Sequence, residues 1–178
     1  MVEQLVERIR HKDQRAMSQL YRIYVKRLSS VCYRYVPSEE DAKDVLQNSF
    51  VKIFDAIGTF EYHDETSFTG WMIKIVMNEA LHFLRDRKRL IFVGIQEDSL
   101  EAEDNPKAEG ITADELHQLI SELPDGYRTV INLFVFEGYT HQEIADILGI
   151  DRATSASQLY YAKQLLAKRI KELTDKRR

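Results

Sequence analysis

Cysteine, glycine and strand-forming patterns are all scarce in this 178-residue sequence. The single cysteine, Cys32, excludes an internal disulfide framework and any zinc site built from several cysteines, so a reducing compartment fits best. The 7 glycines are scattered and form neither a phosphate-binding loop nor the GxSxG turn of a hydrolase. Because helical spacing recurs along most of the chain, the fold class is predicted to be all-α.

Catalytic, metal-binding and membrane-spanning patterns are also lacking. The five histidines form neither an HExxH nor a His-Cys ligand pattern, and a metal site at His63-Asp64-Glu65 is less probable than a solvated loop. We therefore predict no enzyme, no catalytic residue, no metal and no cofactor. The N-terminus MVEQLVERIR has acids where a signal peptide has bases, and no apolar run could span a bilayer. These features predict a cytoplasmic protein without direct membrane insertion.

The net charge of −4 is unevenly distributed. Residues 1–90 hold 15 Lys/Arg and 13 Asp/Glu, and residues 116–178 hold 9 and 8, so both segments are slightly basic. Residues 91–115 hold one Lys and 8 acids, a net charge of −7. Because the acidity lies in one connector, the acidic total is weak evidence against nucleic-acid binding.

Two helical domains are predicted on either side of that connector. In residues 1–90, apolar positions repeat by three and four in a short helix and in long helices at about 13–35, 38–57 and 67–89, which predicts a bundle. In residues 112–178, capping boxes begin helices at Thr112 and Thr140, and Asp151 is expected to cap a last helix. Residues 91–111, with Asn105-Pro106 and Gly110, are predicted to be an acidic linker.

The C-terminal domain is predicted to be four helices that end in a helix-turn-helix. Thr140 and Glu143 start a short helix, Gly149 allows a sharp turn, and a longer helix follows from Asp151. This pattern is typical of DNA-binding proteins, although an ordinary helical hairpin gives the same spacing.

Two further groups of side chains suggest binding surfaces. Asp41, Asp44, Gln47 and Phe50 combine polar groups with an apolar anchor, as a docking surface does, although a solvated helix face is the more frequent meaning of such a pattern. The helix at 67–89 carries Trp71, Lys74, Asn78 and His82 before the basic sequence RDRKR, which suits phosphate contact with base stacking. Trp71 by itself is more often a core residue.

Taken together, these segments resemble the extracytoplasmic-function sigma factors of the bacterial sigma-70 family, over about residues 13–173. DAKDVLQNSFVKIF resembles the core-polymerase-binding helix, and SFTGWMIKIVMNEALHFLRDRKR the segment that engages the −10 element. LPDGYRTVINLFVFEGYTHQEIADILGIDRATSASQLYYAKQLL resembles the −35-reading domain. The resemblance implies a factor that binds core RNA polymerase and directs promoter-specific initiation of transcription.

The resemblance also implies partners and site residues. The partners would be the coiled coil of the largest polymerase subunit, the polymerase flap, promoter DNA and an anti-sigma factor. The polymerase-binding residues would be Asp41, Asp44, Gln47 and Phe50. The −10 residues would be Phe60, Lys74, Asn78, Arg85, Arg87, Lys88 and Arg89, with Phe60 and Asn78 holding an extruded base. The −35 residues would be Thr140, Arg152, Thr154, Ser157, Gln158, Tyr161 and Lys163. Residues 95–110 would thread through polymerase toward the RNA channel.

The predicted recognition helix departs from the family, whose sequence there is rich in bases. TSASQLYYAK keeps only the charge of Lys163 and has Ser155 where a buried valine is usual. Gln158 could still read an adenine edge, and Arg152, just before this stretch, a guanine or a phosphate. Residues 140–163 hold two bases against three acids, which predicts weak binding to DNA without polymerase. The alternatives are a one-component regulator with a C-terminal helix-turn-helix and, less well supported, a helical metal-dependent hydrolase.

Overall fold

The computed structural model describes residues 1–92 and 110–177. The chain divides into two compact units, Met1–Arg87 and Lys88–Arg178. All regular structure in the described ranges is helical, in agreement with the predicted fold class. The predicted linker at 91–111 lies mostly outside the described residues.

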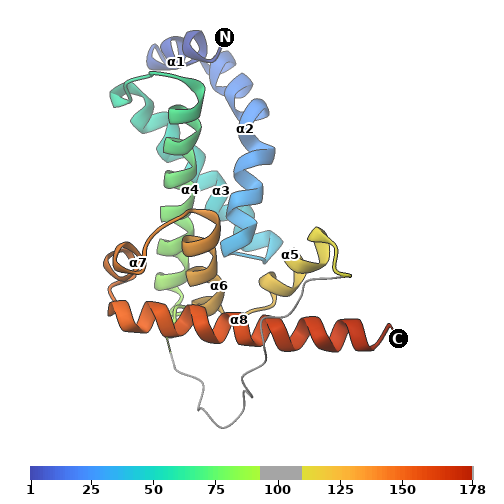
Figure 1. Cartoon of the computed structure of the whole chain (residues 1–178). Helices are drawn as coiled ribbons and strands as arrows, with labels where there is room; N and C mark the ends of the chain where they lie inside the picture. The colour runs from blue at the N-terminus through green and yellow to red at the C-terminus, as the bar shows by residue number, and fades with distance from the viewer. Residues whose placement is uncertain (93–109, 178) are drawn as a thin grey trace. The chain divides into compact units, whose positions relative to one another are not determined.

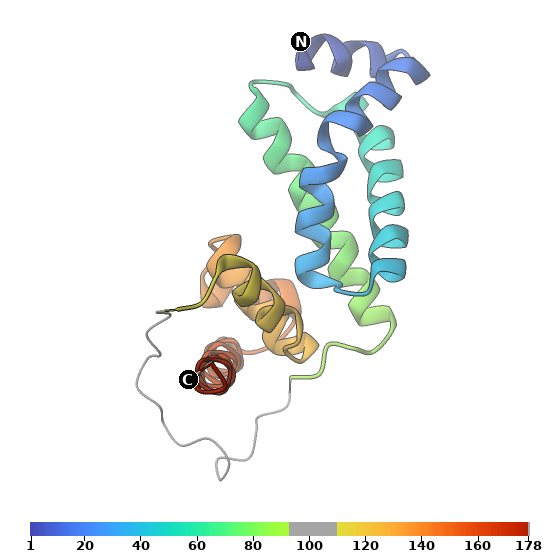
Figure 2. The ribbon, with the colours of Figure 1, turned by 90° about the vertical axis from the view of Figure 1, so that its right-hand side faces the viewer.

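The first unit is a bundle of three long helices with a short helix at one end (Figures 1 and 2). The helices α2, α3 and α4 run alongside one another, and α1 packs against α2 and η1. Their bounds are α1 Val2–Arg10, α2 Gln14–Tyr35, α3 Glu39–Ala56, η1 Ile57–Thr59 and α4 Glu65–Asp86. The bundle's core is apolar: Leu20, Leu28, Ile53, Met72 and Leu84 are all fully buried. Burial of these side chains is the main stabilising contribution of the bundle.

Local sequence signals set the helix ends of this unit. The side chain of Asp13 accepts hydrogen bonds from two backbone amides at the start of α2, and Ser38 caps α3. The helix α4 starts earlier than predicted because Asp64 and Ser67 form a capping box. It ends earlier too, at Asp86, and Lys88 has a φ of 52°, a left-handed conformation that cannot continue a right-handed helix.

The second unit packs shorter helices on one side of a long C-terminal helix (Figures 1 and 2). Its elements are α5 Ala113–Ser121, α6 Asp125–Ile131, a π-helical segment Asn132–Phe136, α7 His141–Leu148 and α8 Arg152–Asp175. Leu123, Val130, Leu133 and Ile144 form the interior, and α8 contributes Leu159, Ala162, Ala167 and Ile170. The four predicted helices are therefore present, with the helix at 126–136 continuing as a π-helical turn.

The predicted helix-turn-helix is formed by α7 and α8. The capping box of Thr140 and Glu143 starts α7, and Gly149 ends it at a φ of 68°, where a side chain would strain the backbone. The amide of Ile150 donates to the carbonyl of Ala145 and closes the turn at 3.1 Å. Asp151 occupies the N-cap position of α8 but, contrary to the prediction, its side chain makes no capping hydrogen bond.

Candidate functional site

The predicted polymerase-binding residues divide between the surface and the interior of the first unit. Asp44 and Gln47 are exposed on α3. Asp41 lies 3.7 Å from Arg87, measured between carboxylate and guanidinium, so part of its charge is offset within the unit. Phe50 is only 4% exposed, and therefore cannot be the projecting anchor that the sequence suggested.

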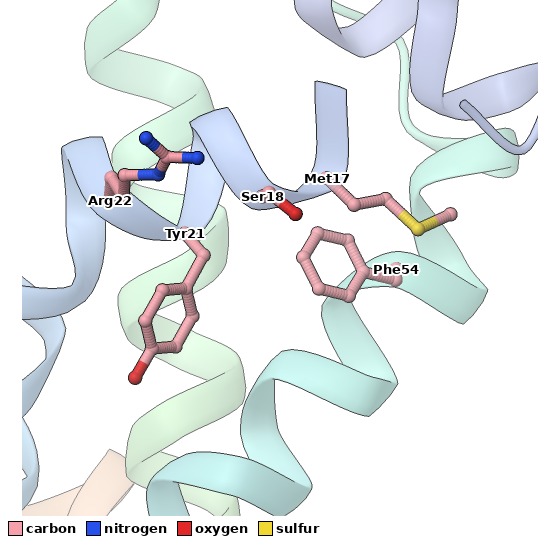
Figure 3. A pocket seen from close by; sticks show the side chains of 5 residues that line it. All are labelled: Met17, Ser18, Tyr21, Arg22 and Phe54. Atoms are coloured by element: carbon pink, nitrogen blue, oxygen red, sulfur yellow. The ribbon is translucent and has the colours of Figure 1, made fainter. Parts of the chain in front are cut away.

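An apolar anchor is instead available at Tyr21 on α2. Its ring lies 4.6 Å from that of Phe50, and the residue is 44% exposed. Beside it, a hollow of about 510 Å³ lies between α2 and α3, and Figure 3 shows Phe54 reaching from α3 toward Met17 and Ser18. Sequence reasoning missed Tyr21 because it lies next to the buried stripe of α2 rather than in it. An aromatic residue at such a flanking position was the available signal.

An aromatic cluster holds the loop between η1 and α4, which contains Phe60, one of the predicted −10 residues. The ring of Phe60 is 4.7 Å from that of Trp71 and 5.4 Å from that of Phe68, and Tyr62 also contacts Phe68. Phe68 is fully buried, whereas Phe60 and Trp71 are half-buried. The cluster thus consists of one buried ring, Phe68, that supports two half-buried rings, Phe60 and Trp71. Partly exposed aromatic rings of this kind are suited to stacking with another planar group.

The α2 helix supports this loop through Tyr24. Its hydroxyl donates a hydrogen bond of 3.2 Å to Glu65, the first residue of α4. Burial and the nearby Glu65 carboxylate raise the pKa of Tyr24 to about 12, so the phenol keeps its proton and remains a donor.

Two of the predicted −10 residues, Lys74 and Asn78, lie in the middle of α4. Lys74 and Asn78 are exposed and four residues apart, so they share one face. Asn78 also lines a hollow of about 410 Å³ between α3 and α4, together with Asp55 and His82. At its rim Lys52 pairs with Glu79, an ion pair that links the two helices.

The basic segment 85–89 covers the last two residues of α4 and the three that follow it. Arg85 and Lys88 are exposed, and Arg87 lies over the Phe83 ring at 4.8 Å. Arg89 belongs to the second unit, where its Nε donates to the carboxylate of Asp125 at 2.6 Å. Its charge is therefore partly offset in this conformation.

Asp125 also forms an ion pair with Arg128, the most deeply buried cation among the described residues. Arg128 is 3% exposed and donates to the carbonyls of Ser121 and Leu123 as well as to Asp125. Burial lowers its pKa, while the Asp125 charge opposes that shift. The network fixes the start of α6 and gives Arg128 a structural role.

The helix-turn-helix exposes only some of the predicted −35 residues. Arg152 and Lys163 are exposed, and Thr154, Ser157 and Tyr161 are half-buried on α8. The Thr140 hydroxyl accepts from the Glu143 amide at 3.3 Å in the capping box, and it also donates to the Glu143 carboxylate at 2.8 Å. Tyr160, which the sequence did not single out, is 51% exposed and contacts Tyr161.

Gln158 lies inside the second unit. It is 1% exposed, and its Oε1 would be 3.4 Å from a Cβ placed on Gly126 of α6. Because α8 packs against both α6 and α7, its buried face is wide enough to include this position. The adenine-reading role suggested for Gln158 therefore has no support in this conformation.

A partly buried polar contact joins the two helices of the helix-turn-helix. His141 Nδ1 lies 3.0 Å from the hydroxyl of Ser155, which is fully buried, and the imidazole stacks on Phe134 at 4.7 Å. Burial, followed by the charges of Arg152 and Lys163, lowers the pKa of His141 and favours the neutral ring. Sequence analysis noted Ser155 as unusual but missed its partner, which is fourteen residues away.

No group of three or more His, Cys, Asp or Glu side chains suited to a metal ion occurs in residues 1–92 and 110–177. Over the same ranges, no helix combines the length and apolarity that crossing a membrane requires.

Comparison with known proteins identifies the class. Residues 20–90 match the family description Sigma-70 region 2, and residues 113–166 match Sigma-70, region 4. The chain is 30% identical to the ECF RNA polymerase sigma-E factor of Salmonella typhimurium, over 95% of this chain and 94% of that protein. It is 29% identical to the RNA polymerase sigma-H factor of Pseudomonas aeruginosa, over 96% and 94% of the two chains.

A solved structure supports the fold. The sigma factor RpoE in complex with the anti-sigma factor NepR, from Bartonella quintana, matches with a TM-score of 0.52 and 21% identity, over 86% of this chain and 96% of that chain. The protein belongs to the extracytoplasmic-function sigma factors of the sigma-70 family. It is thus a transcription initiation factor that binds core RNA polymerase and directs promoter-specific initiation, rather than the one-component regulator held as an alternative.

Proposed function

We propose that the two units divide the work of promoter recognition. Residues 1–90 bind core polymerase and the −10 element, residues 112–178 bind the −35 element, and residues 91–111 connect them as an acidic linker. The observation that carries this proposal is that each unit exposes suitable side chains on one helix: Asp44 and Gln47 on α3, and Arg152 and Lys163 on α8. Their matches to sigma-70 regions 2 and 4 support the same division.

Polymerase binding is assigned to α3 and the adjoining surface of α2. Asp44 and Gln47 supply the polar contacts to the coiled coil of the largest subunit, and Asp41 contributes at the edge, where Arg87 already offsets part of its charge. Tyr21 replaces Phe50 as the apolar anchor, while Phe50 supports it from below. An exposed aromatic residue beside polar groups is the usual composition of an interface hot spot.

The −10 element is assigned to the loop at 60–64 and the exposed face of α4. Phe60 and Asn78 hold an extruded base, with Trp71 behind Phe60. Lys74, Arg85, Arg87 and Lys88 neutralise phosphates, and Arg89 joins them only when it leaves Asp125.

The −35 element is assigned to the N-terminal half of α8. Arg152 and Lys163 contact phosphates or a guanine edge, and Thr154, Ser157 and Tyr161 lie near them, with Thr140 at the start of α7. Because this surface has few cations, it neutralises few phosphates and releases few counterions from DNA. The unit therefore binds duplex DNA weakly by itself. The polymerase flap is its proposed docking partner, and an anti-sigma factor is proposed as a further partner of the chain.

A titration of labelled protein with core polymerase tests the first assignment. The double variant Asp44→Ala, Gln47→Ala should weaken binding by roughly tenfold or more, because truncating central interface residues typically costs about 1–2 kcal/mol. The matched control is Gln118→Ala, an equally exposed glutamine on α5 of the other unit. Equal affinities for the double variant and the control would overturn the α3 assignment.

A second measurement tests the DNA assignments with a genomic library at physiological salt. Protein alone should show little sequence selection, and holoenzyme should select promoters. Tight selective binding by protein alone, at the roughly 10⁻⁸ M or better of free-standing regulators, would contradict the proposed dependence on polymerase.

A further inference from the structure

Arg10, the last residue of α1, reaches a loop that lies fifty residues further along the chain. One terminal nitrogen of its guanidinium, Nη2, donates to the backbone carbonyl of Phe60 at 2.5 Å. The other, Nη1, is paired with Glu7, one turn earlier on the same helix. The guanidinium is thus held in orientation by its own helix while it binds the loop.

The helix that carries Arg10 is itself firmly placed. Its apolar face is buried in the first unit, with Val6 fully buried and Ile9 at 2% exposed. It packs against both α2 and η1. The arginine side chain is 30% exposed, so its hydrogen bond to the carbonyl is only partly shielded from water.

The carbonyl that Arg10 binds belongs to a residue between two helices. Phe60 follows η1 in an extended conformation, with φ −78° and ψ 125°, where no helical ladder serves its carbonyl. The Phe60 ring lies over Trp71 on α4. The main chain of Phe60 is therefore held by Arg10 of α1, and its side chain packs against Trp71 of α4.

From these contacts we propose that Arg10 is a positioning residue for −10 recognition: by binding the Phe60 carbonyl, it holds the aromatic faces of Phe60 and Trp71 ready for an unpaired base of the promoter. The inference rests on the proposed role of Phe60. It adds α1, outside the matched region at 20–90, to the promoter-recognition apparatus. Arg10 acts through the loop and touches no DNA.

The single tryptophan of the chain makes the contact measurable in the free protein. In Arg10→Met, which keeps much of the apolar stem and removes the donors, the loop should loosen and the Phe60 ring should leave Trp71. Trp71 emission should then move to longer wavelength and become more accessible to acrylamide. The matched control is Arg8→Met, on the same helix, because the guanidinium of Arg8 pairs with Asp13 at 2.7 Å instead of with the Phe60 carbonyl.

The functional readout uses holoenzyme and a single-stranded oligonucleotide that carries the −10 segment of a promoter selected by wild-type holoenzyme from a randomised library. We expect Arg10→Met to bind this strand roughly tenfold more weakly, the size of one charge-assisted hydrogen bond. Its affinity for core polymerase and for duplex −35 DNA should stay at the wild-type value. Arg10→Lys, which keeps one donor, should recover part of the loss.

The outcomes separate the two claims. Unchanged Trp71 quenching together with unchanged strand binding in Arg10→Met would overturn the positioning role. Equal loss in Arg8→Met, or loss of core binding in step with strand binding, would show that α1 matters only for stability and would overturn it too. If wild-type holoenzyme fails to bind the strand, the −10 role of this loop is wrong and the inference falls with it, even if Trp71 reports the contact. Should Arg10→Met fail to fold, Arg10→Lys carries the same comparison.

Discussion

The contact between His141 and Ser155 should determine how firmly α8 is held against α7. Replacing Ser155 by alanine removes a fully buried hydroxyl and its 3.0 Å contact with Nδ1 of the imidazole. A hydrogen bond of this kind contributes about 1 kcal/mol net, and an unpaired partner left behind adds to the cost. In a domain of this size, about 1 kcal/mol lowers the melting temperature by roughly 4–8 °C.

Ser157→Ala is the matched control. Its hydroxyl donates only to the carbonyl of Thr154 on the same helix, at 2.9 Å, and the residue is half-buried. Because alanine is the better helix former, the change should be close to neutral. The control therefore separates loss of the interhelical contact from loss of a serine in α8.

Hydrogen exchange followed by mass spectrometry is the appropriate assay, because Trp71 lies in the first unit and does not report on the second. Peptides from α7 and α8 should exchange about fivefold faster in Ser155→Ala, the equivalent of about 1 kcal/mol, while peptides from α2 to α4 keep the wild-type rate. If Ser155→Ala and Ser157→Ala exchange alike, the contact does not stabilise the helix-turn-helix.

Two further changes test other parts of the second unit. In Gly126→Ala, the new Cβ would lie 2.6 Å from the carbonyl oxygen of Ile91, so residues 89–92 should detach from α6 and be cut faster by trypsin at Arg89. In the control Gly70→Ala, the new Cβ meets nothing within 4 Å in the second turn of α4, so the change should be neutral or stabilising by about 0.5–1 kcal/mol. Equal cleavage at Arg89 in both variants would contradict the reasoning. The pKa of His141 is lowered in the folded unit, so the folded state binds the proton less well than the unfolded state does. The neutral imidazole therefore contributes to stability above pH 6.5, and this contribution is lost as the pH falls below 6.5. Exchange in α7 should accelerate from pH 7.5 to 5.5, after correction for the intrinsic rate, and His141→Gln should flatten that dependence while His82→Gln should not.

The sequence by itself determined the helices and most of their ends, since these depend on residues close together in the chain. The capping boxes of Thr112 and Thr140 form as predicted, because a side chain at the N-cap needs only the amide three residues later. Gly149 ends α7 for an equally local reason. The family could also be recognised at this level, because its motifs are contiguous stretches of sequence.

Only the tertiary structure decided which side chains face outward. A helical repeat marks the centre of the buried stripe but not its width, and that width depends on how many neighbours pack against the helix. Gln158 is buried because α8 packs against both α6 and α7, and Phe50 is buried because Tyr21 covers it.

The contacts of Arg10 with Phe60 and of Arg89 with Asp125 join residues 50 and 36 positions apart. No local pattern encodes such a pairing, because whether the two groups meet depends on where whole helices come to rest in the fold.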